Sequence, residues 1–117
     1  MQTVLVVEDE VFIRFVIVED LRDAGFATVE AGNADEAIAI LEARQDIQLV
    51  FTDVDMPGSM NGAKLAAAVR DRWPPVHIVI TSGKAMPILM PVHAVFIPKP
   101  YTAENVVAVM RKFETMV

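Results

Sequence analysis

The sequence predicts an α/β fold: a doubly wound, five-stranded parallel sheet with helices on both faces. Two observations favour this fold class. Five short apolar runs recur along the chain, and most of the segments between them have apolar residues at helical spacing. Strict alternation of strand and helix is typical of parallel βαβ units with right-handed crossovers. The length of 117 residues supports one hydrophobic core, so we expect a single domain over residues 1–117.

The predicted strands are short runs rich in β-branched and aromatic residues. The first of them contains four consecutive apolar residues, Val4 to Val7, which is typical of a strand buried on both faces. The five predicted strands cover residues 3–7, 26–31, 48–52, 76–81 and 94–98.

The predicted helices carry boundary signals. Asn33 is placed to cap a helix over 34–44, with Glu36 three residues later, and Thr102 is placed to cap a helix over 102–115. Gly25 follows the first helix, where a glycine is favoured as a C-cap. A further helix is predicted over 62–72.

The first predicted helix, which contains the segment VFIRFVIVEDL (residues 11–21), is apolar on two faces. Its residues are rich in β-branched side chains, but its length and the turn at Gly25 favour a helix over a strand. One predicted stripe contains Ile13, Val16, Ile17, Leu21 and Ala24, and the other contains Val11, Phe15 and Val18. Such a helix is either deeply buried or carries a docking surface. The second stripe is therefore core, a contact for a partner protein, or a homodimer surface.

The segment between the fourth and fifth strands is unfavourable for a helix. Pro91 lacks an N–H group, and its ring would clash with the carbonyl group of Pro87. Each proline also disfavours helical angles at the residue before it. We expect an apolar loop over 84–93, and a fourth helix that is short or absent.

The composition excludes several classes of function and location. A net charge of −6 argues against nonspecific nucleic-acid binding, which needs clustered basic residues, and leaves a divalent metal or a basic protein surface as partners. The absence of cysteine excludes disulfides and thiolate chemistry and suits a cytoplasmic protein. The N-terminus lacks the basic region of a signal peptide, so we expect no signal peptide. Arg14 and Glu19 interrupt the most apolar helix, so we expect no membrane span.

Polar residues follow the predicted strands where ligands bind in such folds, outside the carboxyl ends of the strands. These residues are Glu8, Asp9 and Glu10 after the first strand, Asp53 and Asp55 at the end of the third, Thr81 and Ser82 at the end of the fourth, and Lys99 after the fifth. The acids are either a solvated rim or a shared cation site.

Carboxylates that converge from two strands suit a hard divalent cation, and Mg²⁺ fits best because it takes one or two carboxylates together with water and phosphate oxygens. An aspartate can also attack a phosphoryl group and form an acyl phosphate. That product needs a metal ion, an ammonium group and a hydroxyl group around it. Asp53 as nucleophile, with Glu8, Asp9, Lys99 and Thr81 around it, would supply these groups.

The chain resembles the receiver domain of two-component response regulators from about residue 3 to residue 115. Four segments carry the resemblance in the family's order: VLVVEDE, LVFTDVDMPGSMNG, IVITSG and FIPKPY. The resemblance implies a flavodoxin-like fold with strand order 2-1-3-4-5. It also implies a cytoplasmic phosphoacceptor switch in phosphorelay signal transduction rather than an enzyme, with a sensor histidine kinase or a histidine phosphotransfer protein as phosphodonor.

The resemblance also implies a role for each matching residue. Asp53 would be the phosphoacceptor and would bind Mg²⁺ together with Glu8, Asp9 and the backbone carbonyl of Asp55. Thr81 would hydrogen-bond to the phosphoryl group, and Lys99 would pair with it. Phe96 falls at the family's aromatic switch position, which does not exclude a role in the core.

Two departures from the family pattern stand out. MPGSMNG holds one residue more than the commonest form between Pro57 and Gly62, and we expect the glycines to absorb it. The span from Thr81 to Lys99 is several residues shorter than usual, which again predicts a short or absent fourth helix and puts the family's usual output face in doubt.

Three functions remain open at this point. The first is a stand-alone switch; because no output domain follows Val117, we expect its signal to leave by protein contact or onward phosphotransfer to an unknown target. The second is a metal-dependent phosphatase of the haloacid-dehalogenase kind, because FTDVD places Asp-x-Asp at a strand end. The third is an inactive receiver that only binds partners.

Overall fold

The computed structural model describes residues 2–56, 60–84, 90–91 and 93–114. Its parallel sheet has the order β2-β1-β3-β4-β5, which confirms the predicted topology. The strands are β1 (Thr3–Val7), β2 (Ala27–Ala31), β3 (Leu49–Asp53), β4 (His77–Ser82) and β5 (Val95–Pro98). Each strand lies within one or two residues of its predicted range.

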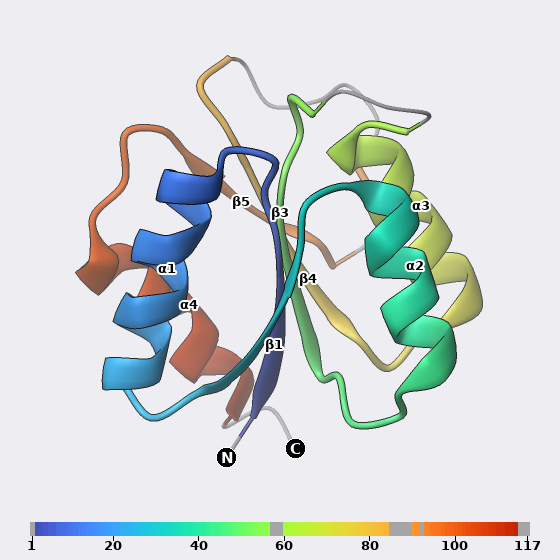
Figure 1. Cartoon of the computed structure of the whole chain (residues 1–117), viewed down its shortest axis with the longest axis horizontal. Coiled ribbons are helices and arrows are strands. Elements are labelled where there is room, and N and C mark those ends of the chain that lie inside the picture. Colours follow the sequence, from blue (N-terminus) through green and yellow to red (C-terminus); the bar gives the residue numbers. More distant parts are fainter. Residues whose placement is uncertain (1, 57–59, 85–89, 92, 115–117) are drawn as a thin grey trace.

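Helices cover both faces of the sheet (Figure 1), which confirms the doubly wound fold class. The helices are α1 (Val11–Asp23), α2 (Ala34–Ala43), α3 (Gly62–Arg72) and α4 (Ala103–Glu114). One hydrophobic cluster joins the sheet to α1 and α4, and the other joins it to α2 and α3. The described residues include no helix long and apolar enough to cross a membrane.

The sheet is most deeply buried at its centre. Val4 to Val7 of β1 have no exposed surface, and every residue of β3 is buried. The run Val4 to Val7 is therefore, as predicted, a strand covered on both faces. Polar residues at the carboxyl ends of β1 and β3 are held at fixed positions by this rigid core.

The predicted helix boundaries are confirmed by their hydrogen bonds. Gly25, with φ of +98°, follows α1; its N–H donates to Arg22 O, and the Phe26 N–H donates to Leu21 O, which together form a Schellman motif. The Asn33 side chain accepts from Glu36 N at the start of α2. The Thr102 hydroxyl accepts from Asn105 N at the start of α4.

The stretch between β4 and β5 contains no helix among residues 83, 84, 90, 91, 93 and 94, which the structure describes. The described residues agree with the prediction that the family's fourth helix is short or absent. The predicted apolar loop over 84–93 has most of its residues, including Ile88 and Leu89, outside the described residues. Met90 is half-buried and packs against the cluster under α2 and α3.

The two predicted stripes of α1 are wrong in part. Ile17, Val18 and Leu21 are buried, so Val18 belongs to the core and not to an exposed stripe. The exposed apolar residues are Val11, Phe12, Ile13, Phe15 and Val16, and we call them the α1 patch. The buried face begins at Arg14, which lies three and four residues before Ile17 and Val18. The apolar pattern missed this face because its first position is a charged residue.

Candidate functional site

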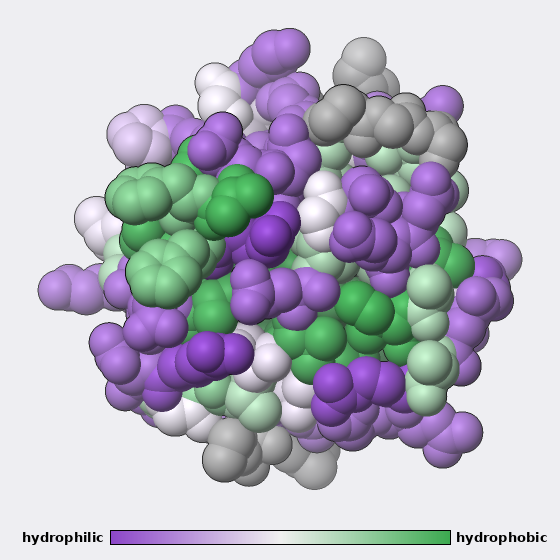
Figure 2. All heavy atoms as spheres, in the orientation of Figure 1, coloured by the Kyte–Doolittle hydropathy of each residue, from purple (hydrophilic) through white to green (hydrophobic). Residues whose placement is uncertain are grey.

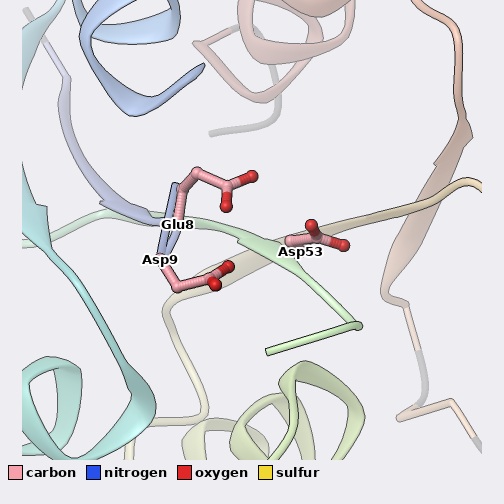
Figure 3. Close-up of side chains that lie close together, drawn as sticks. All are labelled: Glu8, Asp9 and Asp53. Atoms are coloured by element: carbon pink, nitrogen blue, oxygen red, sulfur yellow. The ribbon is translucent and has the colours of Figure 1, made fainter. Parts of the chain in front are cut away.

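Three carboxyl groups meet at the carboxyl edge of the sheet. Glu8 and Asp9 follow β1, and Asp53 ends β3, next to β1 in the sheet (Figure 3). One carboxylate oxygen from each residue lies within 4.8 Å of the other two. Asp53 and Glu8 are almost fully buried, whereas Asp9 is exposed. The predicted acids therefore come together, and their side chains could hold a small hard cation.

Glu8 is held by its backbone and by its side chain. Its N–H donates to Ala31 O of β2 (3.1 Å), and its Oε2 accepts from Glu10 N (2.9 Å). Burial, together with the neighbouring Asp9 and Asp53, raises the pKa of the Glu8 carboxyl to about 7, against the lowering effects of the Glu10 N–H and of Lys99. A bound cation would relieve this crowding of negative charge.

Lys99 pairs with Asp53 from the other side. Its Nζ lies 2.8 Å from Asp53 Oδ2, and its side chain is mostly buried. Burial alone would lower the pKa of Lys99, but the hydrogen bond and charge of Asp53, with the charges of Glu8 and Asp55, raise it above its usual value. Lys99 is thus a fixed cation inside the site and not a plain surface lysine.

Thr81 pairs in register with Asp53 across β4 and β3. Its side chain is buried, and its Oγ1 has no hydrogen-bond partner among the residues that the structure describes. A buried hydroxyl without a partner is unusual and carries a free-energy cost. The Thr81 hydroxyl is therefore available to a group that enters beside Asp53.

Asp55 is turned toward β4. Its N–H donates to Asp53 Oδ1 (3.2 Å), its Oδ2 accepts from Ser82 Oγ (3.1 Å), and its Oδ1 lies 3.7 Å from Lys84 Nζ. Its carboxylate does not belong to the described cluster of Glu8, Asp9 and Asp53. The predicted role of its backbone carbonyl is untested.

Phe96 is half-buried and packs against the cluster under α2 and α3. It lies opposite Ile80 in the β4–β5 ladder. Its role in the core is therefore clear, and its role as a switch remains a prediction.

Two residues of the site had no predicted role. Arg14 Nη1 donates to the backbone oxygen of Glu8 (2.7 Å), and its Nε pairs with Glu30 Oε1 (3.1 Å). Tyr101 follows the FIPKP segment and packs edge-on against Phe51, and burial raises its pKa to about 12. The spacing of Arg14 from the buried residues of α1 is the signal that could have found it; no sequence pattern indicated the Tyr101 contact.

An open cavity of about 470 Å³ lies beside Lys99, the lysine that pairs with Asp53. Its lining combines the Lys99 side chain with apolar and small residues from three segments: Ile13, Gly83, Lys99, Pro100 and Tyr101. One side of this cavity is therefore part of the α1 patch, and the other side carries the lysine that holds Asp53.

Comparison with protein families gives one match over almost the whole chain. Residues 4–111 match the model described as "Response regulator receiver domain". The chain is 31% identical to a putative response regulator NtrX-like protein of Rickettsia bellii and 32% identical to the nitrogen assimilation regulatory protein NtrX of Azorhizobium caulinodans. These matches cover 93% and 97% of the chain but only 24% and 26% of the relatives, so the chain spans about a quarter of their length.

Solved structures agree with the family match. The receiver domain of the hybrid histidine kinase CckA is 29% identical, with a TM-score of 0.80 and coverage of 94% of this chain and 96% of that one. The response regulator TrrA of Thermotoga maritima, solved in complex with Mg²⁺-BeF, is 25% identical, with a TM-score of 0.87 and coverage of 96% and 98%. The haloacid-dehalogenase alternative finds no support in these matches.

Proposed function

The chain belongs to the response regulator receiver domain family, and we propose that it is a phosphoacceptor switch in which Asp53 takes a phosphoryl group from a phosphohistidine. Receiver domains are signalling modules, so the catalysis expected of this one is limited to its own phosphorylation and dephosphorylation. We also propose that the protein is cytoplasmic. That residues 1–117 form a single domain is still a prediction.

One observation carries the proposal. Asp53 lies between two acids and one lysine, and the hydroxyl of its register partner Thr81 has no partner of its own among the described residues. If the acids were only a solvated rim, nothing would explain why the Thr81 hydroxyl is buried without a hydrogen-bond partner beside Asp53. An acyl phosphate on Asp53 would give Thr81 an acceptor and would give Lys99 a stronger counter-charge.

The residues present fit a magnesium ion. Glu8, Asp9 and Asp53 offer oxygen ligands only, which Mg²⁺ prefers, and they leave positions for water and for phosphoryl oxygens. Mg²⁺ would neutralise negative charge on the incoming phosphoryl group. We expect Glu8, Asp9, Asp53 and the backbone carbonyl of Asp55 to hold it, and we expect its removal to abolish phosphorylation.

The transfer step follows from the site. A carboxylate oxygen of Asp53 attacks the phosphorus, the N–P bond of the phosphohistidine breaks, and the electron pair returns to the imidazole nitrogen. Lys99 and Thr81 then hold the phosphoryl oxygens by charge and by a hydrogen bond. Water later attacks the phosphorus, which releases inorganic phosphate and restores the Asp53 carboxylate.

The phosphodonor is expected to dock on the α1 patch. Figure 2 shows hydrophobic residues gathered over the upper end of α1, the end where the helix begins. Phe12 and Phe15 are 71% and 59% exposed, and soluble proteins rarely keep such a patch without a use. The patch adjoins the cavity beside Lys99 through Ile13, so a donor seated there would bring its histidine toward Asp53. A homodimer through the same patch is the competing occupant.

We expect the phosphorylated state to be read out by protein contact. Phosphorylation would draw the Thr81 hydroxyl toward the phosphoryl group and shift Phe96, which lies opposite Ile80 on the neighbouring strand. The target of this contact is a protein surface, because the chain's net charge of −6 does not favour nucleic acid.

The test of the proposal is transfer from a phosphorylated histidine. A histidine phosphotransfer protein or kinase domain is labelled on its histidine, mixed with the chain and Mg²⁺, and the label is followed. Transfer to the wild type and not to Asp53→Asn supports the proposal. Steady release of phosphate from small phosphate esters would favour a phosphatase instead, and binding of partners without any transfer would favour an inactive receiver.

A further inference from the structure

Arg14 links α1 to the end of β1 and to β2, at the carboxyl ends of the strands where the acids lie. Its guanidinium group donates from Nη1 to the backbone oxygen of Glu8 (2.7 Å) and from Nε to Glu30 Oε1 of β2 (3.1 Å). Its side chain is only 19% exposed although it lies on a surface helix. A Cβ atom added to Gly32 would lie 3.3 Å from Arg14 Nη1, so the guanidinium group is closely packed.

The contact with Glu8 comes where the strand ladder ends. The Glu8 N–H still bonds to Ala31 of β2, as a strand residue would, but β1 ends at Val7. The Glu8 carbonyl accepts from Arg14, and the Glu8 carboxylate accepts from Glu10 N. The N–H, the carbonyl and the carboxylate of Glu8 are therefore all held by hydrogen bonds. This is the point of the chain from which the carboxylates of Glu8 and Asp9 reach Asp53.

We propose that Arg14 is a positioning residue of the metal site: by holding the Glu8 carbonyl, it fixes the turn that brings the carboxylates of Glu8 and Asp9 to Asp53. The inference rests on the proposed function and adds a residue to it. Partners that orient metal ligands in this way commonly contribute 10- to 100-fold in metal affinity.

The chemistry requires an arginine. One guanidinium group donates from two nitrogens in a fixed plane and can serve Glu8 and Glu30 at once, whereas a lysine ammonium is a point charge on a flexible stem. Arg14→Lys therefore keeps the charge and loses the geometry.

The charge of Arg14 would act in the opposite direction from its hydrogen bonds. A positive charge bonded to the backbone of Glu8 repels Mg²⁺ at the neighbouring metal site, so its removal alone would strengthen metal binding. Loss of the hydrogen bond to the Glu8 carbonyl would loosen the acids and weaken metal binding. The sign of the change in affinity therefore separates positioning from charge.

The experiment measures Mg²⁺ affinity by calorimetry for the full chain, for Arg14→Lys and for Arg14→Met. Arg22→Met is the matched control, because Arg22 also links α1 to β2, through Thr28 Oγ1 at 2.8 Å, but at the last turn of the helix. We expect both Arg14 variants to bind Mg²⁺ roughly tenfold more weakly, and we expect Arg22→Met to bind like the wild type.

Hydrogen exchange of the metal-free protein gives a second readout. The Glu10 N–H, bonded to the Glu8 carboxylate, should exchange faster in the Arg14 variants while amides of β3 keep their protection. Glu30→Gln provides a milder variant in case Arg14→Met does not fold, because Glu30 is 44% exposed. It should weaken Mg²⁺ binding by a smaller factor, and because the loss of its negative charge would also weaken Mg²⁺ binding, faster exchange of the Glu10 N–H is the readout that decides for this variant.

Unchanged or tighter Mg²⁺ binding by Arg14→Met and Glu30→Gln would overturn the positioning role. Equal weakening in Arg22→Met would overturn it too, because it would indicate a general effect of loosening α1. Failure of the wild type to bind Mg²⁺ at all would be a different result, since it would defeat the proposed function and this inference with it.

Discussion

Lys99 Nζ lies 2.8 Å from Asp53 Oδ2, in a pocket that Asp53 shares with two further carboxyl groups. In the metal-free protein this ammonium group offsets negative charge that a divalent cation would otherwise offset. Lys99 and a metal ion are therefore expected to compete electrostatically for the same carboxylate, although both would serve an acyl phosphate.

Replacement of Lys99 by methionine should separate these two effects. We expect Lys99→Met to lose about 1–2 kcal/mol of metal-free stability, because Asp53 stays buried without its counter-charge. We expect the same variant to bind Mg²⁺ more tightly than the wild type. Urea unfolding and calorimetry measure the two quantities. The expected gain in Mg²⁺ affinity is opposite in sign to the loss expected for Arg14→Met. Weaker Mg²⁺ binding by Lys99→Met would show that Lys99 does not compete with the metal ion.

Gly62 should resist substitution by alanine. A Cβ atom there would overlap the backbone carbonyl of Asp53, although Gly62 opens α3, where alanine is ordinarily the better helix former by about 1 kcal/mol. We therefore expect Gly62→Ala to destabilise the protein by roughly 2 kcal/mol or more and to weaken metal binding. Gly83→Ala is the control, because among the residues that the structure describes its Cβ would meet only Lys99 Cδ, at 4.0 Å. Equal stability of both variants in urea would refute the close approach.

Tyr101 should ionise at a higher pH than a free tyrosine side chain does. It is the single tyrosine of the chain, so ultraviolet absorbance follows it without ambiguity. Burial, with the negative charges of Glu8, Asp53 and Asp20, raises its pKa from 10.0 to about 12. The folded state then binds this proton more tightly than the unfolded state, so stability should fall as the pH rises from about 10 to about 12. Ionisation near pH 10 in the folded protein would contradict the burial of this ring.

The α1 patch should matter for the protein donor and not for a small one. We expect Phe12→Asp and Phe15→Asp to fold, to accept a phosphoryl group from acetyl phosphate normally, and to accept it poorly from a phosphohistidine protein. Ala67→Asp adds the same charge on an exposed position of α3 and should behave like the wild type. Equal loss with both donors would mean that the patch supports the fold. A change of oligomeric state alone, measured by light scattering, would favour a homodimer.

The strands and the acids at their ends could be predicted from the sequence. Val4 to Val7 form an uninterrupted apolar run followed directly by charge, which leaves little choice for the position of a strand end. The topology of a parallel sheet then brings the carboxyl ends of β1 and β3 together, so the cluster of Glu8, Asp9 and Asp53 followed from the strands alone.

The faces of α1 could not be predicted in the same way. Apolar residues surround this helix, so periodicity did not decide which of them face the sheet, and the deciding residue was the charged Arg14. Contacts such as that of Arg14 with the Glu8 carbonyl, or of Ser82 with Asp55, join residues by the direction of single side chains. Sequence spacing carries no information about such directions across different elements.

The most direct test of the account is the intact mass of the protein after incubation with Mg²⁺ and acetyl phosphate. We expect the wild type to gain one phosphoryl group, and we expect the gain to disappear when Mg²⁺ is removed. Asp71→Asn, which changes an exposed acid in the last turn of α3, should keep the gain, and Asp53→Asn should lose it. A mass gain that persists in Asp53→Asn, or a wild type that never gains mass, would contradict the assignment of Asp53 as the phosphoacceptor.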